Sequence, residues 1–558
     1  MQNRIWHTSY PSAVPKTLAY EDITMPEILS RSAKTFSSTT ALLFMGKKIS
    51  FAELERLVNQ FANALKQIGV KQGDRVSLLL PNIPQIVIAY YAIWRVGAIP
   101  VPNNPLYTDR ELEHQFNDSG STALITLDIL APRMLKLRDK TQIRQIVCCH
   151  INDYLPFPLK QLFPRLKKGM YRKFEPAPDY CEFREVIEKA SPVSDVITPA
   201  MDDLALIPYT GGTTGPSKGV ALSHRNVSYV TQNFKAWFYD LHDTCERAMG
   251  IFPFFHMAGF TGVMNACILM GWTDILIPKP EPKTIFDTMM KYRATFVPAV
   301  PTIYTSLLGL PEFGKKDMSF VKGFFSGAAQ LPLTIIEQLK HAAGAHVIEA
   351  HGMTESTTII TLTPWRGKLK VGSVGVPIPD TDLKIVDIED GITEKPVGEA
   401  GEIIFKGPQM LQGYYNKPEE TATAIRNGWF YTGDIGKLDE DGYLYIVDRK
   451  KDMIIAGGFN IYPRDIDEVL FEHPKVLEAC VIGIPDEYRG ETVKAFVVSR
   501  PGEKVTEKDL DAFCRERLTA YKVPQIYEFV NALPKSAVGK ILRKDLREQE
   551  MAKRKMND

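Results

Sequence analysis

The sequence predicts an α/β protein with a β-rich segment beyond the middle of the chain and a small α+β portion at its C-terminal end. Between residues 21 and 200, short apolar runs that suit buried strands alternate with stretches that repeat apolar residues at helical spacing. Residues 371–448 alternate apolar and polar side chains between turn signals, which indicates a compact β subdomain. Beyond residue 449, helical and strand patterns are mixed again.

Composition limits the classes of protein to consider. With 558 residues the chain exceeds one ordinary core, so we expect two or more domains. Hydrophobic residues make up 44% and charged residues 24%, as in soluble globular proteins. A formal net charge of +1 argues against a nucleic-acid binder, which would show a basic excess. The 7 cysteines form no C-x-x-C pair and no His/Cys cluster at metal spacing, so we expect reduced thiols, a cytoplasmic location and no zinc site.

Neither a signal peptide nor a membrane span is expected. The first residues lack the apolar core of a signal peptide. Residues 249–277 are the one stretch apolar enough to be considered as a span, but they contain His256, Asn265 and Asp274, whose polar groups are costly in lipid. We therefore expect this stretch to form buried core and a wall of a substrate pocket.

The first 150 residues alternate between the two kinds of pattern. Helices are expected at residues 25–33, 50–68 and 82–95, and strands at 76–80, 98–101, 122–127 and 145–149. Ser50 is a suitable N-cap for the second helix. A strand, a helix and a strand in succession make a βαβ unit, so the strands should be parallel.

Residues 154–174 interrupt this alternation with a mixture of basic and large apolar side chains. The basic residues are Lys160, Arg165, Lys167, Lys168, Arg172 and Lys173. Such mixtures can lie on an anionic membrane surface. The alternative is a solvated surface insertion with a few buried anchors.

The most informative stretch lies at residues 209–220 and reads Tyr-Thr-Gly-Gly-Thr-Thr-Gly-Pro-Ser-Lys-Gly-Val. Glycines let the backbone approach a ligand closely, and successive N–H groups in such a loop form an anion-binding concavity. It is not a Walker A loop, because Lys218 stands three residues after Gly215 and is followed by glycine. We interpret it as a polyphosphate-binding loop; a glycine- and threonine-rich hairpin is the alternative.

This loop resembles the signature loop of the adenylate-forming superfamily, which comprises acyl-CoA synthetases, luciferases and peptide-synthetase adenylation domains. Further segments resemble the family's motifs in the same order along the chain. They are Phe-Pro-Phe-Phe-His-Met-Ala-Gly at 252–259, Lys-Gly-Phe-Phe-Ser-Gly-Ala-Ala-Gln-Leu at 322–331, His-Gly-Met-Thr-Glu-Ser at 351–356, Gly-Trp-Phe-Tyr-Thr-Gly-Asp-Ile at 428–435, and Leu-Pro-Lys-Ser-Ala-Val-Gly-Lys-Ile-Leu-Arg at 533–543. Each of these motifs is weak evidence by itself. Their occurrence in the same order as in the family makes the resemblance specific.

The resemblance implies an architecture. It implies a large N-terminal domain, residues 1–448, made of two α/β subdomains plus a β-rich subdomain. A small, mobile α+β C-terminal domain, residues 449–558, follows a hinge near 449–452, and Lys451 corresponds to the hinge residue. Gly457 and Gly458 correspond to the segment that meets the pantetheine tunnel.

The resemblance also implies the residues that bind ATP and Mg²⁺. Those implied for the β- and γ-phosphates are Thr210, Gly211, Gly212, Thr213, Thr214, Gly215 and Lys218. Thr354 and the catalytic Lys540 would act at the α-phosphate, where a lysine stabilises the charge that develops during adenylation. Glu355 and Thr214 would hold Mg²⁺, as hard oxygen ligands should.

The remaining implied roles concern the nucleoside and the acid. Gly327, Ala328 and Ala329 would pack on adenine, as would His351, where the family usually has tyrosine, with Gly352 and Met353 beside it. Asp434 would accept hydrogen bonds from the ribose, and Arg449 would reach ribose or phosphate. His256 would border the carboxylate site; since a buried imidazole must find a partner, the alternative is a core histidine bonded to a backbone carbonyl.

The chain therefore resembles an acyl-CoA synthetase that uses ATP, Mg²⁺ and CoA. Apolar residues at 254–270 and 324–329, with the insertion at 154–174, favour a long-chain fatty acid. The alternatives are an aryl or medium-chain acid, a carrier-protein-loading domain, and a non-catalytic ATP-binding, membrane-associated protein. A carrier-loading domain would carry an aspartate near residues 254–256, and a ligase that does not use CoA would carry an insertion near the hinge; neither is present in the sequence. Peripheral contact with the inner face of an anionic membrane and a homodimeric state are left open.

Overall fold

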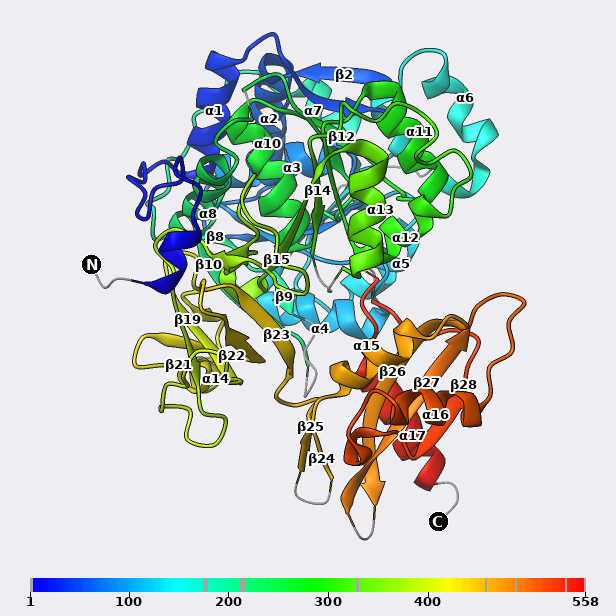
Figure 1. Ribbon diagram of the computed structural model, residues 1–558. Coiled ribbons are helices and arrows are strands. Elements are labelled where there is room, and N and C mark those ends of the chain that lie inside the picture. The colour runs from blue at the N-terminus through cyan, green and yellow to red at the C-terminus, as the bar shows by residue number, and fades with distance from the viewer. Residues whose placement is uncertain are drawn as a thin grey trace. The chain divides into compact units, whose positions relative to one another are not determined.

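The computed structural model describes residues 4–173, 179–210, 216–241, 243–327, 331–456, 459–486, 489–536 and 539–555. The chain divides into two compact units (Figure 1). One comprises Met1–Asp382 with Lys406–Gly428, and the other comprises Leu383–Phe405 with Trp429–Asp558. This partition groups residues 429–448 with the C-terminal part of the chain. The predicted boundary at 448/449 stays a prediction.

The first sheet of the first unit is the βαβ region that the sequence predicts. Its strand order is β4-β3-β5-β6-β7, and all of its pairs are parallel. The strands are β3 (Arg75–Leu79), β4 (Ile99–Pro102), β5 (Ser121–Leu127), β6 (Gln145–Cys149) and β7 (Tyr180–Glu182). The four expected strands are thus confirmed to within two residues. The short strand β7 was not predicted.

The predicted early helices are confirmed as α1 (Met25–Thr35), α2 (Phe51–Gln67) and α3 (Pro84–Arg95). The Ser50 side chain accepts a hydrogen bond from the N–H of Glu53 over 3.1 Å, the cap expected at the start of α2. All 12 residues of α3 are buried. A helix that is apolar on every side belongs in the interior, which explains why α3 shows little one-sided pattern.

The second sheet of this unit has nine strands in the order β17-β16-β15-β14-β13-β11-β12-β1-β2. They are β1 (Thr40–Phe44), β2 (Lys47–Ser50), β11 (Arg247–Gly250), β12 (Thr273–Leu276), β13 (Phe296–Ala299), β14 (Gly323–Ser326), β15 (His346–His351), β16 (Thr361–Leu362) and β17 (Val376–Pro377). The interior pairs from β1 to β15 are parallel. Figure 1 shows α11 (Pro282–Tyr292), α12 (Pro301–Leu308) and α13 (Leu333–Ala343) beside this sheet, and their apolar faces form one core with its strands.

Residues 249–277 form buried core, as predicted, rather than a membrane span. Between β11 and β12 the chain forms α9 (Met257–Gly259), the π-helix η4 (Phe260–Asn265) and α10 (Ala266–Met270). None of the helices in the described ranges is long and apolar enough to cross a membrane. The expected burial of His256 is wrong, however, because this residue is exposed.

A small antiparallel sheet completes the first unit. Its strands are β8 (Leu204–Leu206), β9 (Tyr209–Thr210), β10 (Lys218–Ser223) and β20 (Gly413–Tyr414), with β10 paired to each of the others. The remaining α-helices in the described part of this unit are α4 (Asp109–Ser119), α5 (Ala131–Arg138), α6 (Leu159–Leu166), α7 (Phe183–Lys189), α8 (His224–Trp237) and α14 (Pro418–Ala424).

The described residues of the second unit form two sheets. The expected β-rich segment includes β18 (Asp382–Val386), β19 (Gly401–Lys406), β22 (Trp429–Leu438) and β23 (Leu444–Arg449). The other sheet has the order β25-β24-β27-β26, with β28 paired to β27. Its strands are β24 (Ile454–Ala456), β25 (Phe459–Ile461), β26 (Val476–Asp486), β27 (Gly490–Ser499) and β28 (Ile526–Phe529), packed with α15 (Pro463–Glu472), α16 (Glu507–Arg515) and α17 (Arg543–Lys555).

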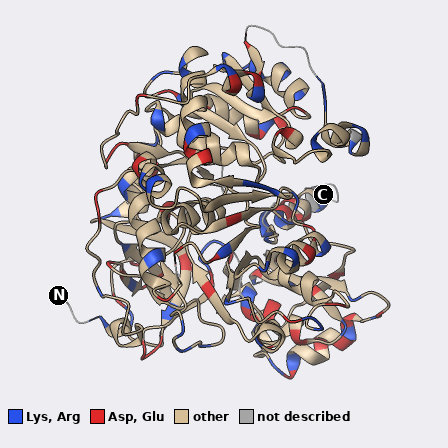
Figure 2. Cartoon of the chain, turned by 90° about the horizontal axis from the view of Figure 1, so that it is seen from above, with Lys and Arg blue, Asp and Glu red and all other residues tan. Residues whose placement is uncertain are grey.

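Basic and acidic residues are interspersed along the described chain (Figure 2). This distribution agrees with the formal net charge of +1.

Candidate functional site

The ends of the predicted polyphosphate loop are held by the β9–β10 hairpin. Thr210 lies opposite Lys218 in the ladder, and its hydroxyl donates to the Lys218 carbonyl over 3.5 Å. A Cβ at Gly219 would lie 2.8 Å from Ile207 Cγ2, so this position needs glycine. The predicted phosphate-binding residues Gly211, Gly212, Thr213, Thr214 and Gly215 lie outside the described residues.

Helix α4 supports both sides of this hairpin. The Tyr209 hydroxyl donates to Asp118 over 2.8 Å, and Gln115 Nε2 donates to the Ser217 hydroxyl over 3.2 Å. His114 Nε2 lies 2.8 Å from the Ser217 carbonyl. The loop therefore begins and ends on a fixed frame.

Lys218 is connected to Glu355 through Tyr414, a residue that the sequence did not single out. The Lys218 ammonium lies 4.5 Å from the centroid of the Tyr414 ring, a cation–π contact. The Tyr414 hydroxyl donates to Glu355 Oε1 over 2.9 Å. Burial, followed by the charge of Glu355, raises the pKa of Tyr414, so the phenol stays a donor at neutral pH. The predicted phosphate lysine and the predicted Mg²⁺ ligand thus share one partner.

Residues 351–358 form a tight turn at the carboxyl end of β15. A Cβ at Gly352 would lie 1.9 Å from the Thr358 carbonyl oxygen, so only glycine fits. Thr357 and Thr358 have φ values of 53° and 126°, which are unfavourable for β-branched residues. Their hydroxyls donate to the carbonyls of Gln409 (2.7 Å) and Met257 (2.8 Å), which compensates for part of this strain. Thr354 and Glu355 lie inside this turn, as η5 (Thr354–Ser356), and both are half-buried.

The bond from Thr358 to Met257 joins this turn to the segment that contains His256. A Cβ at Gly259 would lie 2.3 Å from the Pro253 carbonyl oxygen, so the chain turns sharply there. This turn leaves Met257 and Phe260 buried and His256 exposed. The imidazole is therefore accessible to a ligand, whereas the sequence argument took it to be buried.

The predicted adenine-binding residues of the first unit also follow strand ends. Gly327 comes directly after β14, and His351 is the last residue of β15, with Gly352 and Met353 next. Ligands of open α/β sheets bind at the carboxyl ends of the strands, so these positions are suitable. Ala328 and Ala329 lie outside the described residues.

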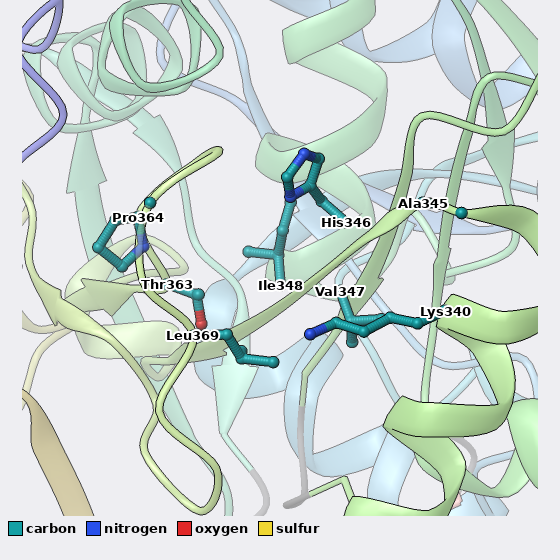
Figure 3. A pocket seen from close by; sticks show the side chains of 10 residues that line it. Lys340, Ala345, His346, Val347, Ile348, Thr363, Pro364 and Leu369 are labelled. Atoms are coloured by element: carbon teal, nitrogen blue, oxygen red, sulfur yellow. The ribbon is translucent and has the colours of Figure 1, made fainter.

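A pocket of about 410 Å³ lies at the opposite end of β15. Figure 3 shows His346, Val347 and Ile348 from this end of the strand, with Lys340 of α13 and Thr363. Because the candidate residues stand at the carboxyl end, this pocket is separate from the candidate nucleotide site.

In the second unit, Asp434 and Arg449, both predicted to contact the nucleotide, lie side by side. They lie opposite each other on β22 and β23, with Arg449 Nε 3.2 Å from Asp434 Oδ1. Asp434 is only 5% exposed, and its N–H donates to the Thr432 hydroxyl over 3.0 Å. Its carboxylate is therefore fixed in position, as an acceptor for ribose hydroxyls should be.

Lys451 and Lys540 belong to the same charged cluster. Desolvation, followed by the charge of Arg449, lowers the pKa of each lysine to about 8. Both residues are exposed, and the charges of Asp434 and Lys451 also act on the ammonium of Lys540. The backbone N–H of Lys540 donates to the Ser536 hydroxyl over 3.2 Å, which holds the base of this side chain. Gly457 and Gly458 lie outside the described residues.

The donor set at Glu355 fits Mg²⁺ better than a metal that needs a protein cage. Within the described ranges, no three His, Cys, Asp or Glu side chains come together to hold a metal. Mg²⁺ binds through one or two carboxylates together with substrate phosphates, and Glu355 can supply one carboxylate. Thr214, the other predicted ligand, is outside the described residues.

The interrupting segment at 154–174 contains the amphipathic helix α6. Phe163 is buried, whereas Phe157 (82% exposed), Leu166 (66%), Leu159 and Leu162 are exposed. Lys160, Arg165 and Lys167 of this segment are intermediate or exposed. The helix therefore presents both apolar and basic side chains to solvent.

Comparison with known proteins extends these observations to the whole chain. The model of the AMP-binding enzyme family matches residues 29–415, and that of the AMP-binding enzyme C-terminal domain matches residues 465–540. The chain is 44% identical to a long-chain-fatty-acid–CoA ligase of Bacillus subtilis (strain 168), with 98% of each chain covered. It is 36% identical to a long-chain-fatty-acid–CoA ligase of Escherichia coli O6:H1, with 99% of each covered.

A solved structure supports the fold. ATP-bound MatB from Rhodopseudomonas palustris superposes with a TM-score of 0.84 at 30% identity, covering 94% of this chain and 99% of that one. The predicted fold class, a mixed α/β protein with a large N-terminal and a small C-terminal domain, is thus confirmed.

Proposed function

The chain belongs to the AMP-binding enzyme family, and from this premise we propose that it is an AMP-forming acid–CoA ligase for long-chain fatty acids. A fatty-acid carboxylate attacks the α-phosphate of ATP, so that acyl-AMP forms and pyrophosphate leaves. The CoA thiol then attacks the acyl carbon, loses its proton and displaces AMP, which gives acyl-CoA. Because the carboxylate is already a nucleophile, the protein contributes positioning and electrostatic stabilisation.

The observation that supports this proposal best is the connection of Lys218 and Glu355 through Tyr414. Through Tyr414, the ammonium of Lys218, proposed to bind the β- and γ-phosphates, is connected to the carboxylate of Glu355, which suits Mg²⁺. Thr210 and Thr354 add hydroxyl donors to these two elements. Mg²⁺, when bound, neutralises phosphate charge and orients the leaving pyrophosphate.

The remaining assignments concern four residues of the second unit and His256 of the first. We assign Asp434 to the ribose hydroxyls, Arg449 to ribose or phosphate, and Lys540 to the charge that develops on the α-phosphate. His256 is assigned to the border of the carboxylate site. Lys451 is assigned to the hinge about which the C-terminal domain, residues 449–558, rotates between adenylation and CoA transfer.

The long-chain substrate is supported by the two relatives, each named a long-chain-fatty-acid–CoA ligase. Phe254, Met257 and Phe260 are buried, and apolar side chains of this kind would suit an alkyl chain. The competing substrates are aryl and medium-chain acids.

ATP- and CoA-dependent release of AMP, measured with acetate, octanoate, palmitate and coumarate, tests the proposal. We expect the largest kcat/KM with palmitate. A maximum with acetate or coumarate would retain the mechanism and overturn the fatty-acid assignment. Release of AMP with none of these acids would favour a non-catalytic ATP-binding protein.

We also propose that α6 contacts an anionic membrane surface, where a long-chain substrate would be available to a cytoplasmic enzyme. The exposed Phe157, Leu159 and Leu166 would enter the interface while neighbouring lysines and arginines contact lipid phosphates. Co-sedimentation with vesicles tests this. We expect binding to phosphatidylglycerol vesicles that weakens when Lys160, Arg165, Lys167, Lys168, Arg172 and Lys173 are changed to Ser. Unchanged binding would exclude this surface.

A further inference from the structure

The contacts of the segment around Lys451 change partner between residues 450 and 451. Upstream, Lys450 is held by the β-rich part of the second unit. Its N–H donates to the Gly433 carbonyl over 2.9 Å, and its ammonium donates to Glu402 Oε2 over 2.8 Å. Arg449 pairs with Asp434 of the same sheet.

Downstream, the N–H groups of Asp452 and Met453 still donate to the Arg449 carbonyl, over 2.9 Å and 3.1 Å, but the other contacts are with helix α17. Arg547 Nη1 donates to the Lys451 carbonyl over 3.3 Å and to Asp452 Oδ1 over 2.8 Å, while its Nη2 donates to the Asp452 carbonyl over 3.2 Å. A pivot at Lys451 would leave all three bonds intact, because Arg547 and Asp452 lie on the same side of it.

The side chain of Asp448 makes contacts across the pivot. It lies on β23, upstream of the pivot, but its Oδ2 accepts from the N–H of Arg464 in α15 over 2.8 Å. Its Oδ1 lies 4.0 Å from Nη1 of Arg543 in α17. The carboxylate is 4% exposed, so water competes little for these contacts. Rotation about Lys451 would have to break both.

In the structure, the contacts of Asp448 occur together with a particular position of Lys540. Arg543 stands at the start of α17, three residues after Lys540, and the ammonium of Lys540 interacts with Asp434 and Arg449. The proposed adenylation step requires the lysine near the groups assigned to the nucleotide, and Asp434 and Arg449 are close enough for their charges to act on it. Loss of the Asp448 contacts would leave that arrangement less populated.

We propose that Asp448 is a latch that holds the adenylation orientation of the C-terminal domain. It is a positioning residue and acts through Lys540. This inference rests on the proposed function, because it presupposes the two half-reactions and a pivot at Lys451.

The test compares Asp448→Asn with Asp452→Asn, the same chemical change on opposite sides of the pivot. Asp452 is also buried, at 7% exposure. Adenylation is measured as palmitate-dependent exchange of pyrophosphate into ATP, and transfer as palmitoyl-CoA formation from supplied palmitoyl-AMP and CoA. Both are measured at pH 6.5, below the pKa of about 8 of Lys540.

We expect Asp448→Asn to slow adenylation about tenfold and to leave transfer within about twofold, because one charged hydrogen-bond acceptor is lost. Asp452→Asn should leave the ratio of the two rates unchanged. If Asp448→Asn slows both rates equally, or slows neither, the proposal that Asp448 holds the adenylation orientation is wrong. Should that variant not fold, Asp448→Glu, which retains the charge but displaces it, tests the same ratio. Absence of both half-reactions in the unaltered protein would instead refute the proposed function.

Discussion

The hydroxyl of Tyr414 donates a hydrogen bond to Glu355, and the ring of the same tyrosine lies against the ammonium of Lys218. The N–H of Leu411 also donates to the Glu355 carbonyl over 2.9 Å, so this short segment holds both the backbone and the side chain of the glutamate. One residue therefore contacts both Lys218 and Glu355, the two groups proposed to act at the phosphates.

Replacing Tyr414 by Phe distinguishes between its two contacts. The ring and its contact with Lys218 remain, while the hydrogen bond to Glu355 is lost. Because hydrogen bonds to charged groups contribute about 1.5–3 kcal/mol, we expect the apparent affinity for Mg²⁺ to fall roughly tenfold or more. Titration of activity with Mg²⁺ at fixed ATP measures this change. Tyr431→Phe is a matched control, since the Tyr431 hydroxyl donates to the Gly391 carbonyl instead. An equal loss in both variants would contradict the role of Tyr414.

Lys540→Ala tests the assigned catalytic lysine. We expect adenylation to fall by about 10²–10³-fold, the usual effect of removing one preorganised charge donor, with ATP affinity nearly unchanged. Pyrophosphate exchange and equilibrium binding of ATP measure the two quantities. Lys544→Ala, which removes a lysine on α17 paired to Glu548 at 3.6 Å, is the control and should leave both unchanged. Unaltered adenylation in Lys540→Ala would show that the lysine is not catalytic.

The pKa of Lys540, about 8, predicts a pH dependence with a definite sign. Desolvation and the charge of Arg449 disfavour the ammonium, so Lys540 loses its proton at lower pH than an ordinary lysine. Since the role proposed for Lys540 requires its charged form, the rate of adenylation should fall as pH rises through about 8.

Lys451→Gln removes a neighbouring positive charge, which should move this decline to higher pH, whereas Asp434→Asn should move it to lower pH. The pH profile of pyrophosphate exchange measures both shifts. A decline that stays in place in both variants would show that another group titrates.

Much of the fold was predictable because apolar periodicity reports burial on one side of an element. Residues 145–149 and the cap at Ser50 are examples in which local pattern and tertiary structure agree. The order of the motifs likewise predicted roles for Thr354, Glu355, Asp434 and Arg449, and these roles stay predictions. The first two residues lie in the turn after β15 and the other two form an ion pair. Two features of the candidate site were not predicted from the sequence. Tyr414 contacts Lys218 only because β20 pairs with β10, and that pairing joins distant parts of the sequence. His256 has apolar neighbours in sequence, but the turn enforced at Gly259 places its imidazole outside.

The turn after β15 offers a last prediction, about stability. In Gly352→Ala the new methyl group would lie 1.9 Å from the Thr358 carbonyl oxygen, a backbone atom that cannot move without disturbing Thr357 and Thr358. Overpacking of this kind costs about 1–3 kcal/mol or more, so we expect a lower Tm and a loss of adenylation. Gly327→Ala is the matched control, because its Cβ would meet nothing closer than the Phe252 ring at 3.9 Å, an ordinary contact. Thermal unfolding of the two variants measures the difference. If Gly352→Ala is as stable as Gly327→Ala, the turn is more adaptable than its contacts indicate, and the position of Glu355 cannot depend on it.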